Sequence, residues 1–420
     1  MPELVPLSRF AEVNPSADAS MVPAETPVSF IPMAGVAEGG GWCSTEVRPI
    51  SDSHKGYTLF RRGDVIVAKI TPCFENGKVA LLTGLESVFG LGSTEFHILR
   101  AKPGNDPRFV YHWTRHPDFL RAGEASMTGS AGQRRVPAAF FDRFEVVETD
   151  GNEQPLIADI LDAIDKTIME IDALIAKLRT VRLGIVDDLL TRGLNSTGSP
   201  RGSTELVLTE AGTRPASWKV SPLGCFVPRA EYGTNLSMGD LREGLPVLRM
   251  NNIQDGEFDL SDLRYAPTPA VERFRLQKND VLFNRTNSWE HVGKAAIWRR
   301  DEAGPAFASY LVRLHCGNEL LPKFLHLWLN WAPVQRAIRQ FATPGVQQVN
   351  INPTNLRRAV IAMPDTIDEQ QAIVNRVDAI AATIDHHRGE RGKLANLRNG
   401  LRDDLLTGRV PLVEVREAAE

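Results

Sequence analysis

The feature that most constrains the fold of this chain is an internal repeat, in which the second half of the sequence resembles the first. When each residue n is placed beside residue n+216, the segment GDVIVAKITPCFENGKVAL at 63–81 falls beside NDVLFNRTNSWEHVGKAAI at 279–297. The same offset places DDLLT at 187–191 beside DDLLT at 403–407. One offset that holds at separated places indicates a tandem duplication. The fold is therefore expected to consist of two similar halves.

Each half is predicted to begin with a globular α+β part. Short runs such as VIVAKI, FHILRA, VLFNRT and ASYLVRLH are rich in β-branched and aromatic residues and lie between turn formers, which predicts strands. The stretches PRFVYHWTRHPDFLRA and PKFLHLWLNWAPVQRAI have the periodicity of amphipathic helices. We expect one globule at 1–150 and the other at 205–365, and the Ser- and Gly-rich segment at 195–204 as the linker between the halves.

Each half is predicted to end in a long helix, at 151–194 and at 366–412, with a short tail at 413–420. In both stretches apolar residues recur at alternating spacings of four and three, which is the heptad seam of a coiled coil. The seam residues of the first helix are Ile157, Leu161, Ile164, Ile168, Ile171, Ile175 and Leu178. Those of the second helix are Ile373, Val377, Ile380, Ile384, Leu394, Leu401 and Leu405.

Neither seam can bury itself, so the two helices are expected to pair. A pseudo-twofold relation between the halves would set the helices antiparallel, with Ile157 near Leu405. In that arrangement Arg391, a polar interruption of the second seam, would face Ile171 or its neighbours. About 39 residues at 1.5 Å each give a rod of roughly 58 Å. The sequence therefore predicts two α+β globules separated by a rigid antiparallel coiled coil.

Composition excludes several classes of protein. The four cysteines have no CxxC spacing, so a disulfide scaffold and a structural zinc site are not expected. No apolar run approaches the roughly 18 residues of a membrane span, and MPELVPLSRF at the start lacks the pattern of a secretory signal, so a cytoplasmic location is expected. The net charge of −4 hides an excess of Lys and Arg over Asp and Glu at 201–364.

Motifs of catalysis are incomplete. The segments NPTN at 352–355 and NPSA at 14–17 begin like the base-holding motif of adenine methyltransferases but lack its aromatic residue. There is no GxxxxGK[ST] phosphate loop. His112 and His116 lack the acidic neighbour of a zinc motif and are interpreted as part of a surface helix, and the pair at 386–387 has no spaced partner. We therefore expect a non-catalytic chain that binds no metal or cofactor itself.

The order globule–helix–globule–helix, with the two matched segments above and PVLRMNNIQDG at 246–256, resembles the specificity subunit of type I restriction-modification systems. The resemblance covers nearly the whole chain. It implies two target-recognition domains, each of which reads half of a split sequence in double-stranded DNA. It also implies that the coiled coil sets the gap and holds two methyltransferase subunits, which bring S-adenosylmethionine. Restriction and translocase subunits would bring ATP and Mg²⁺.

Residues for DNA contact are expected in the matched mid-globule segments and in one loop of each half. Arg or Lys suits guanine and Asn or Gln suits adenine, whereas phosphates need only cations or amides. The candidates of the first globule are Lys69, Thr71, Asn76, Lys78, Gln133, Arg134 and Arg135. Those of the second are Asn284, Arg285, Asn287, Ser288, Lys294, Gln347, Gln348 and Asn350. Because they match at the repeat offset, Lys78 and Lys294 are predicted to be phosphate contacts.

The loops differ between the halves. The loop of the first half contains Gln133-Arg134-Arg135, where the loop of the second half contains Val346-Gln347-Gln348. This contrast predicts a guanine preference in one half-site and an adenine preference in the other. Two other classes of function stay open: a coiled-coil scaffold whose globules hold proteins, and a nuclease or methyltransferase with unfamiliar motifs. Each candidate side chain also has an ordinary alternative as a solvated surface residue.

Overall fold

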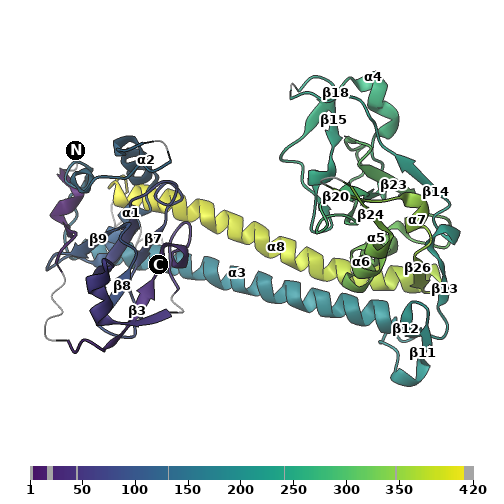
Figure 1. Ribbon diagram of the computed structural model, residues 1–420, viewed down its shortest axis with the longest axis horizontal. Helices are drawn as coiled ribbons and strands as arrows, with labels where there is room; N and C mark the ends of the chain where they lie inside the picture. Colours follow the sequence, from purple (N-terminus) through teal and green to yellow (C-terminus); the bar gives the residue numbers. More distant parts are fainter. Residues whose placement is uncertain are drawn as a thin grey trace. The chain divides into compact units, whose positions relative to one another are not determined.

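The computed structural model describes residues 3–16, 22–43, 46–130, 132–240, 242–345 and 348–410. The predicted tail at 413–420 lies outside these ranges. The chain divides into two compact units, residues 1–173 with 389–420 and residues 174–388. These bounds fall inside the two long helices, so each unit contains one globule and one end of each helix (Figure 1).

The first globule is built on two sheets. The first sheet is antiparallel and has the strand order β2 (Ala11–Val13), β9 (Phe96–Ala101), β6 (Val65–Ala68) and β7 (Val79–Leu81). All four residues of β6 are buried, as expected for a continuous apolar run in a strand covered on both faces. The second sheet has the order β4 (Glu46–Pro49), β3 (Pro27–Ile31), β8 (Phe89–Gly92) and β5 (Thr58–Arg61), and in it β3 and β8 are parallel.

Two helices, α1 (Pro107–Thr114) and α2 (Pro117–Ser126), and the strand pair β1 (Leu4–Pro6) and β10 (Glu145–Val147) complete this globule. Asp106 caps α1 by accepting a hydrogen bond from the backbone N–H of Arg108. The core joins Phe109 of α1 and Phe119 of α2 to the apolar residues of β6, β7 and β9.

The second globule repeats this plan. Its antiparallel sheet has the order β14 (Arg229–Tyr232), β23 (Leu311–His315), β19 (Val281–Asn284) and β21 (Ala295–Ile297). A three-stranded sheet follows, with the order β18 (Arg264–Ala266), β15 (Leu245–Leu248) and β22 (Ala306–Phe307), in which β15 and β22 are parallel. The pair β13 (Lys219–Pro222) and β26 (Val360–Met363) corresponds to β1 and β10. The predicted duplication of an α+β globule is confirmed.

The helices of the second globule are α5 (Pro322–Asn330) and α6 (Ala332–Ile338), which correspond to α1 and α2, and the short α4 (Thr268–Val271) and α7 (Pro353–Leu356). Two hairpins extend it, β11 (Leu206–Thr209) with β12 (Gly212–Pro215), and β16 (Ile253–Gln254) with β17 (Glu257–Phe258). A further sheet has the order β20 (Thr286–Asn287), β25 (Val349–Ile351) and β24 (Ala342–Pro344). Trp328 and Trp331 lie in the core.

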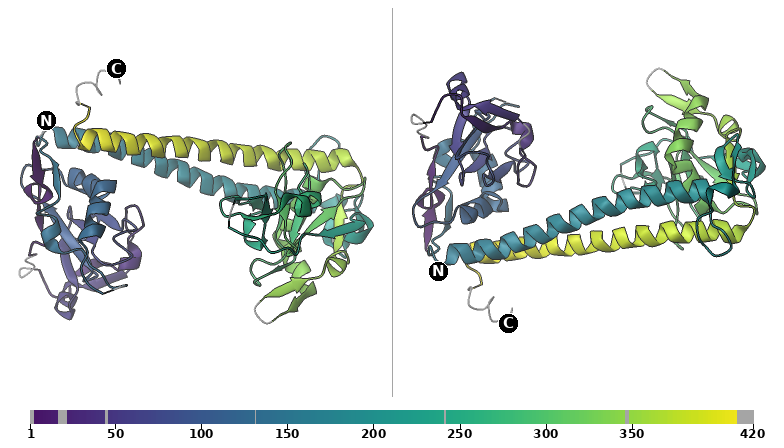
Figure 2. Two further views of the ribbon diagram at one scale, coloured as in Figure 1. Left: turned by 90° about the horizontal axis from the view of Figure 1, so that it is seen from above. Right: turned by 90° about the horizontal axis from the view of Figure 1, so that it is seen from below.

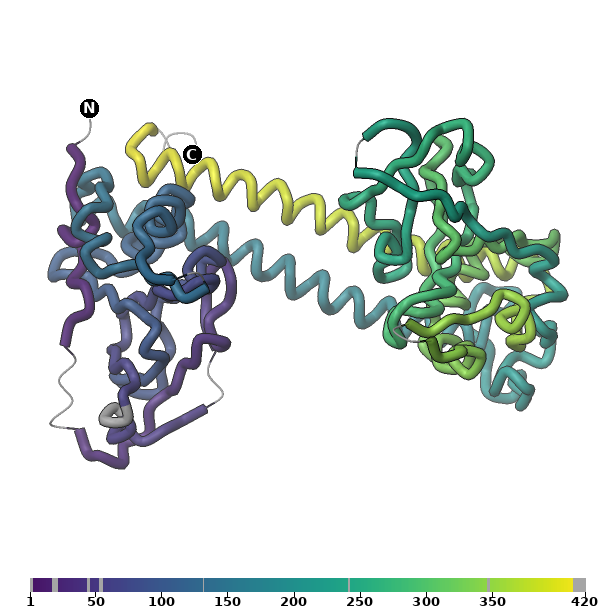
Figure 3. Tube along the Cα trace, turned by 45° about the horizontal axis from the view of Figure 1, so that its top comes forward, coloured from purple at the N-terminus to yellow at the C-terminus, as the bar shows by residue number. Residues whose placement is uncertain are grey.

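The two long helices are α3 (Glu153–Arg192) and α8 (Ile367–Leu406), each of 40 residues. In both halves the chain runs from the globule into one of these helices (Figure 3). The seam residues Ile157, Leu161, Ile168, Ile175, Ile373, Val377, Ile384 and Leu405 are buried. The other seam residues are half-buried, namely Ile164, Ile171, Leu178, Ile380, Leu394 and Leu401.

The helices pack side by side and antiparallel, which confirms the prediction (Figure 2). In the first unit, Ile157 at the start of α3 shares a core with Leu405 at the end of α8. In the second unit, Leu189 near the end of α3 shares a core with Ile373 near the start of α8.

The arginines that interrupt the seam of α8 form ion pairs with aspartates of α3. Arg398 Nη1 lies 3.0 Å from Asp165 Oδ1, and Arg391 Nε lies 3.2 Å from Asp172 Oδ1. Arg391 therefore faces the neighbour of Ile171, as predicted. Burial opposes the ionisation of Asp165, but Arg115 and Arg398 outweigh burial and hold the pKa of its carboxyl below the usual value. The arginines that break the apolar pattern thus fix the register of the pair.

A glutamine of the repeated Glu-Gln dipeptide ties each long helix to its globule. Gln154 Oε1 accepts from the backbone N–H of Asp106, and Gln370 Oε1 accepts in the same way from Leu321. Both glutamines are fully buried, and both donate from Nε2 to two further oxygens. This repeated contact holds the residue before α1, or before α5, against the first turn of the long helix.

The interpretation of His112 and His116 as part of a surface helix is wrong. Both side chains are only 2% exposed. His112 Nε2 lies 2.9 Å from Asp162 Oδ1 of α3, and the ring of His116 caps α2 by accepting from the backbone N–H of Asp118. The polar face of α1 packs against the acidic face of α3, which covers His112, whereas His116 Nε2 lies 3.4 Å from Asp403 Oδ1 of α8.

The segment at 195–204 is tied into the fold. Leu194 and Pro200 form a β-bridge, and Arg201 makes a two-point ion pair with Glu369 of α8, with Nη1 to Oε1 at 2.6 Å and Nη2 to Oε2 at 2.9 Å. Glu369 Oε1 also accepts from the indole of Trp218. A charge-assisted pair of this kind fixes the segment at the start of α8.

Buried His326 predicts a dependence of stability on pH. Its Nε2 donates to the carbonyl of Gly256 at 2.8 Å, and burial lowers its pKa to about 4. An unfolded histidine titrates near pH 6.5, so only the unfolded chain takes up this proton between about pH 6.5 and 4. The free energy of unfolding of the second globule is therefore expected to fall by roughly 3 kcal/mol across that window.

The variant His326→Gln keeps a donor for Gly256 but cannot take up this proton. Urea denaturation of the full chain at several pH values, followed by tryptophan fluorescence, is expected to show a shallower fall in stability for His326→Gln than for the wild type. The same pH dependence in both proteins would contradict the assignment to His326.

Candidate nucleic-acid interface

The first group of predicted residues lies where β6 ends and the loop at 128–136 returns. The backbone of Arg135 forms bridges with Ile70 and with Thr128. The N–H of Thr71 donates to the carbonyl of Arg134, and the N–H of Val136 donates to the carbonyl of Lys69. These bonds bring the mid-globule segment and the loop together, although more than 50 residues separate them.

Carboxylates hold most of the polar candidates of the first globule. Glu95 binds the guanidinium of Arg135 at two points, both 2.9 Å. Glu75 Oε1 accepts from Thr71 Oγ1 at 2.7 Å and lies 3.6 Å from Arg134 Nη2.

Asn76 is also held by a carboxylate, and the remaining candidates of this globule have different surroundings. Asn76 Nδ2 donates to Glu38 Oε1 at 2.8 Å, and Lys78 Nζ donates to the carbonyl of Met33 at 3.1 Å. Lys69 is half-buried and Gln133 is exposed. Lys78 is therefore engaged with its own fold, whereas Gln133 lies open to solvent.

The second group surrounds Met250. The carbonyl of Met250 accepts from Asn284 Nδ2 at 2.9 Å and from Asn287 Nδ2 at 3.4 Å, and Gln348 Nε2 lies 3.7 Å from its sulfur. Asn284 is 0% exposed and so supports the site from beneath. Arg285 lies over the ring of Tyr232, with 5.2 Å from its guanidinium carbon to the ring centroid.

The remaining candidates of the second globule are less engaged. Ser288 and Lys294 are half-buried, and the N–H of Ser288 donates to Asn287 Oδ1 at 2.8 Å. Asn350 lies on β25 opposite Thr286 of β20. Gln347 lies outside the described residues.

Unsatisfied polar atoms gather in this second group. Within the described part of the chain, four buried atoms of β19, β20, β25 and the residue between β19 and β20 lack a hydrogen-bond partner: Asn284 Oδ1, Arg285 Nε, Thr286 Oγ1 and Asn350 Oδ1. Buried polar groups are nearly always hydrogen-bonded, so such a cluster indicates a place where water or a ligand completes the network. Trp289 and Tyr310, respectively 50% and 42% exposed, belong to the same region.

The structure corrects the match between the two loops. The N–H of Val136 donates to the carbonyl of Lys69, and the N–H of Ile351 donates in the same way to Arg285. Arg135 therefore corresponds to Asn350, Arg134 to Val349 and Gln133 to Gln348. The pairing of Arg134-Arg135 with Gln347-Gln348 is wrong by two residues, because it sets the two loops 213 residues apart whereas the backbone contacts set them 215 apart.

Three residues of these groups are not predicted from the sequence: Glu75, Glu95 and Met250. Glu75 and Glu95 follow no motif, and Met250 acts through its backbone carbonyl. The counterpart of Glu95 is Tyr310, because the N–H of Lys69 donates to the carbonyl of Glu95 and that of Arg285 to the carbonyl of Tyr310. Only Met250 carries a sequence signal, since it lies within the segment at 246–256.

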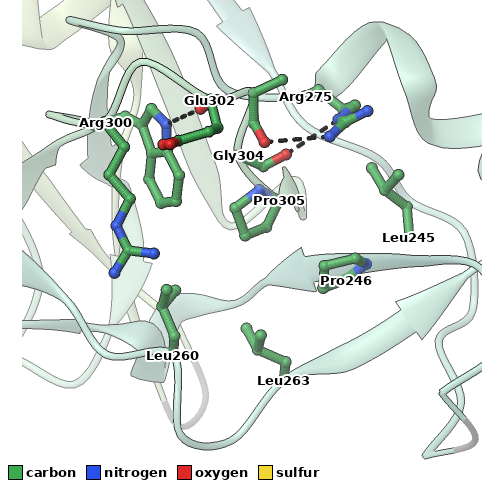
Figure 4. A pocket seen from close by; sticks show the side chains of 11 residues that line it. Leu245, Pro246, Leu260, Leu263, Arg275, Arg300, Glu302, Gly304 and Pro305 are labelled. Atoms are coloured by element: carbon green, nitrogen blue, oxygen red, sulfur yellow. Dashed lines mark hydrogen bonds between the residues drawn. The ribbon is translucent and has the colours of Figure 1, made fainter.

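A cavity of about 540 Å³ lies elsewhere in the second globule (Figure 4). Leu245, Leu260 and Leu263 line its apolar side, and the side chain of Arg275 is held by the carbonyls of Gly304 and Ala303. It contains none of the predicted DNA contacts. Among the described residues, no group of His, Cys, Asp or Glu has the arrangement of a metal site, and no helix is long and apolar enough to cross a membrane.

Comparison with known proteins gives one consistent answer. No family model matches the chain. It is 44% identical over 144 residues to the EcoAI specificity subunit of Escherichia coli, a type I restriction enzyme, and this match covers 33% of the chain and 24% of that protein. It is 24% identical to the EcoEI specificity subunit of Escherichia coli, with 88% of the chain and 76% of that protein covered. The chain thus spans about a quarter of the first relative and about three quarters of the second.

Solved structures share the fold. A chain from a study of complex assembly and conformational transition in a type I restriction-modification system superposes with a TM-score of 0.57 at 18% identity and covers 97% of this chain and 98% of its own length. The type I S subunit from M. genitalium gives a TM-score of 0.53 at 14% identity, with 96% of each chain covered. The chain is thus similar in sequence to specificity subunits of type I restriction enzymes, and it shares its fold of repeated globules and an antiparallel helix pair with these solved structures.

Proposed function

We propose that this chain is the sequence-specific DNA-recognition subunit of a type I restriction-modification complex and that each globule reads one half of an interrupted duplex sequence. The observation that carries the proposal is the repeated polar face. In both halves the end of β6 or β19 meets a returning strand, with Arg135 in the first and Asn350 in the second at the matched position. Arginine suits guanine and asparagine suits adenine in the major groove, so the two halves would read different bases.

The helix pair is proposed to set the gap between the half-sites and to carry two methyltransferase subunits. Met169 and Leu183 of α3 are 71% and 67% exposed and lie two heptads apart, on a face that the seam does not use. We propose that each of these two exposed apolar side chains packs against a methyltransferase subunit. The methyltransferase subunits would bring S-adenosylmethionine, and restriction and translocase subunits would bring ATP and Mg²⁺.

In this proposal the chain itself performs no chemistry and acts in the cytoplasm, where the complex meets DNA. The partners would carry out methylation and cleavage. The specificity subunit would determine where on the DNA methylation and cleavage occur, through the bases that its two globules recognise.

Mobility-shift titration tests the proposal. The chain with its methyltransferase subunits is mixed with a pool of random duplexes and with duplexes enriched from that pool. We expect tighter binding to enriched duplexes than to random ones, and a steep loss of affinity between 50 and 200 mM salt because phosphate contacts release counterions. Equal affinity for all duplexes would favour the alternative of a scaffold that binds only proteins.

A further inference from the structure

Arg135 of the first globule is held in a fixed position by its backbone. Its N–H donates to the carbonyl of Thr128 at 2.8 Å, and its carbonyl accepts from Thr128 at 3.0 Å. Lys69 lies on the other side, where its carbonyl accepts from Val136 at 2.8 Å and its N–H donates to the carbonyl of Glu95 at 2.9 Å. The same short stretch of backbone therefore positions both Arg135 and Glu95.

The side chain of Arg135 is fixed as firmly as its backbone. Nε donates to Glu95 Oε2 and Nη2 donates to Glu95 Oε1, both at 2.9 Å, and Nη1 lies 3.2 Å from the carbonyl of Gln133. The carboxylate thus occupies the Nε side of the planar guanidinium. Nη2 gives one hydrogen to Glu95 and Nη1 gives one to the carbonyl of Gln133, and the side chain of Arg135 is 43% exposed.

Nη1 and Nη2 each keep a second N–H, and together these two supply the donor pair that guanine requires. Guanine presents two acceptors, O6 and N7, in the major groove, and arginine reads them with two N–H groups from one edge of its fork. An arginine already held by a carboxylate loses little side-chain entropy when it binds. Since the pKa of Glu95 is lowered by its hydrogen bond to Arg135, the carboxylate stays ionised at neutral pH.

The same pairing makes Arg135 a poor phosphate contact. A carboxylate at two-point contact cancels the charge of the guanidinium, and it repels a phosphate that approaches from the same side. Glu75, within 3.6 Å of Arg134, does the same for the adjacent arginine. The second globule has Asn350 and Tyr310 at the positions of Arg135 and Glu95, so it holds no such ion pair there.

We infer that Glu95 is a positioning residue for base reading: it presents the Nη1–Nη2 end of Arg135 to a guanine of the first half-site and keeps Arg135 from binding phosphates of non-cognate DNA. The inference rests on the proposed function and names the base class and the residue that enforces it. Glu95 itself need not contact DNA. Its role is distinct from that of Arg135, which reads the base.

The test uses the full chain with its methyltransferase subunits and the variant Glu95→Gln. Affinity is measured on the selected duplex, on duplexes with each base of the first half-site changed, and on random duplexes, at several salt concentrations. For Glu95→Gln we expect discrimination at one G·C pair of the first half-site to fall on the order of tenfold. Affinity for random duplexes is expected to rise, and the slope of log affinity against log salt to steepen by about one, since a cation is released for phosphate binding.

Three matched variants make the result decisive. Glu95→Asp keeps the carboxylate and is expected to retain most of the discrimination. Arg135→Lys keeps the charge without the fork and is expected to lose the discrimination at the same base pair. Tyr310→Phe, at the matched position of the second globule, is expected to leave the first half-site unchanged.

The outcomes separate this inference from the proposed function. If the wild-type complex selects no sequence, the proposed function fails. If the wild type selects a sequence but Glu95→Gln keeps full discrimination and an unchanged salt slope, the proposed function stands and the role of Glu95 is overturned. Equal weakening on every duplex with no change of slope, as loss of folded protein would give, also overturns it.

Discussion

A matched insertion of three heptads into both long helices is expected to lengthen the preferred gap between the half-sites by about one turn of DNA. Twenty-one residues add roughly 31 Å of helix, close to the 34–36 Å repeat of B-DNA. The insertions belong after Lys177 in α3 and before His386 in α8, because the pairs Arg398–Asp165 and Arg391–Asp172 place these points opposite each other. Whole heptads keep the seam in phase.

The gap is read by selecting duplexes from a random pool with the complex of the lengthened chain. Shorter insertions serve as controls. One heptad in each helix adds only about three base pairs of length and turns the second half-site to another face of the duplex, so binding is expected to be lost. Four residues in α3 alone put its seam out of phase with α8, with the same expected loss. If the lengthened chain kept the original gap, the helix pair would not be the spacer.

Truncation of the two matched readers is expected to relax different half-sites. Arg135→Ala should reduce discrimination at a guanine of one half-site, and Asn350→Ala should reduce it at an adenine of the other, each by roughly tenfold to a hundredfold. The reason is that each side chain makes two hydrogen bonds at once with only one base, arginine with guanine and asparagine with adenine. Binding constants on duplexes with single base changes give the measurement.

Gln133→Ala supplies the control for this pair. The side chain of Gln133 is exposed, and the corresponding residue of the other half, Gln348, is also a glutamine. This position therefore cannot account for a difference in base preference between the half-sites. We expect a smaller effect from it than from Arg135→Ala. Equal loss at both half-sites from either reader variant would contradict the assignment of one globule to one half-site.

The repeat and the seam could be predicted from the sequence because both are periodic. A heptad pattern follows from the geometry of one helix, and the partner of that helix follows from the second copy. The polar interruptions proved informative: Arg391 faces Asp172 where the antiparallel register requires it.

Contacts across the fold could not be predicted in the same way. Both His112 and His116 are buried, but His112 lies beside Asp162 of α3 and His116 beside Asp403 of α8. The sequence pattern around the two histidines gives no sign of either contact. Glu95 lies beside Arg135 because the backbone of Lys69 bonds to Glu95 through its N–H and to Val136 through its carbonyl. The match predicted between the two loops is also two residues out of register, since only the backbone contacts of Val136 and Ile351 show which residues correspond.

The central claim is that two homologous globules, joined by paired helices, read one interrupted sequence. Selection of duplexes from a random pool by the full chain with its methyltransferase subunits tests it most directly. We expect the enriched duplexes to share two short fixed words, one with a required guanine and one with a required adenine, at one constant spacing of unspecified bases. A single uninterrupted word, two words at variable spacing, or no enrichment would contradict it.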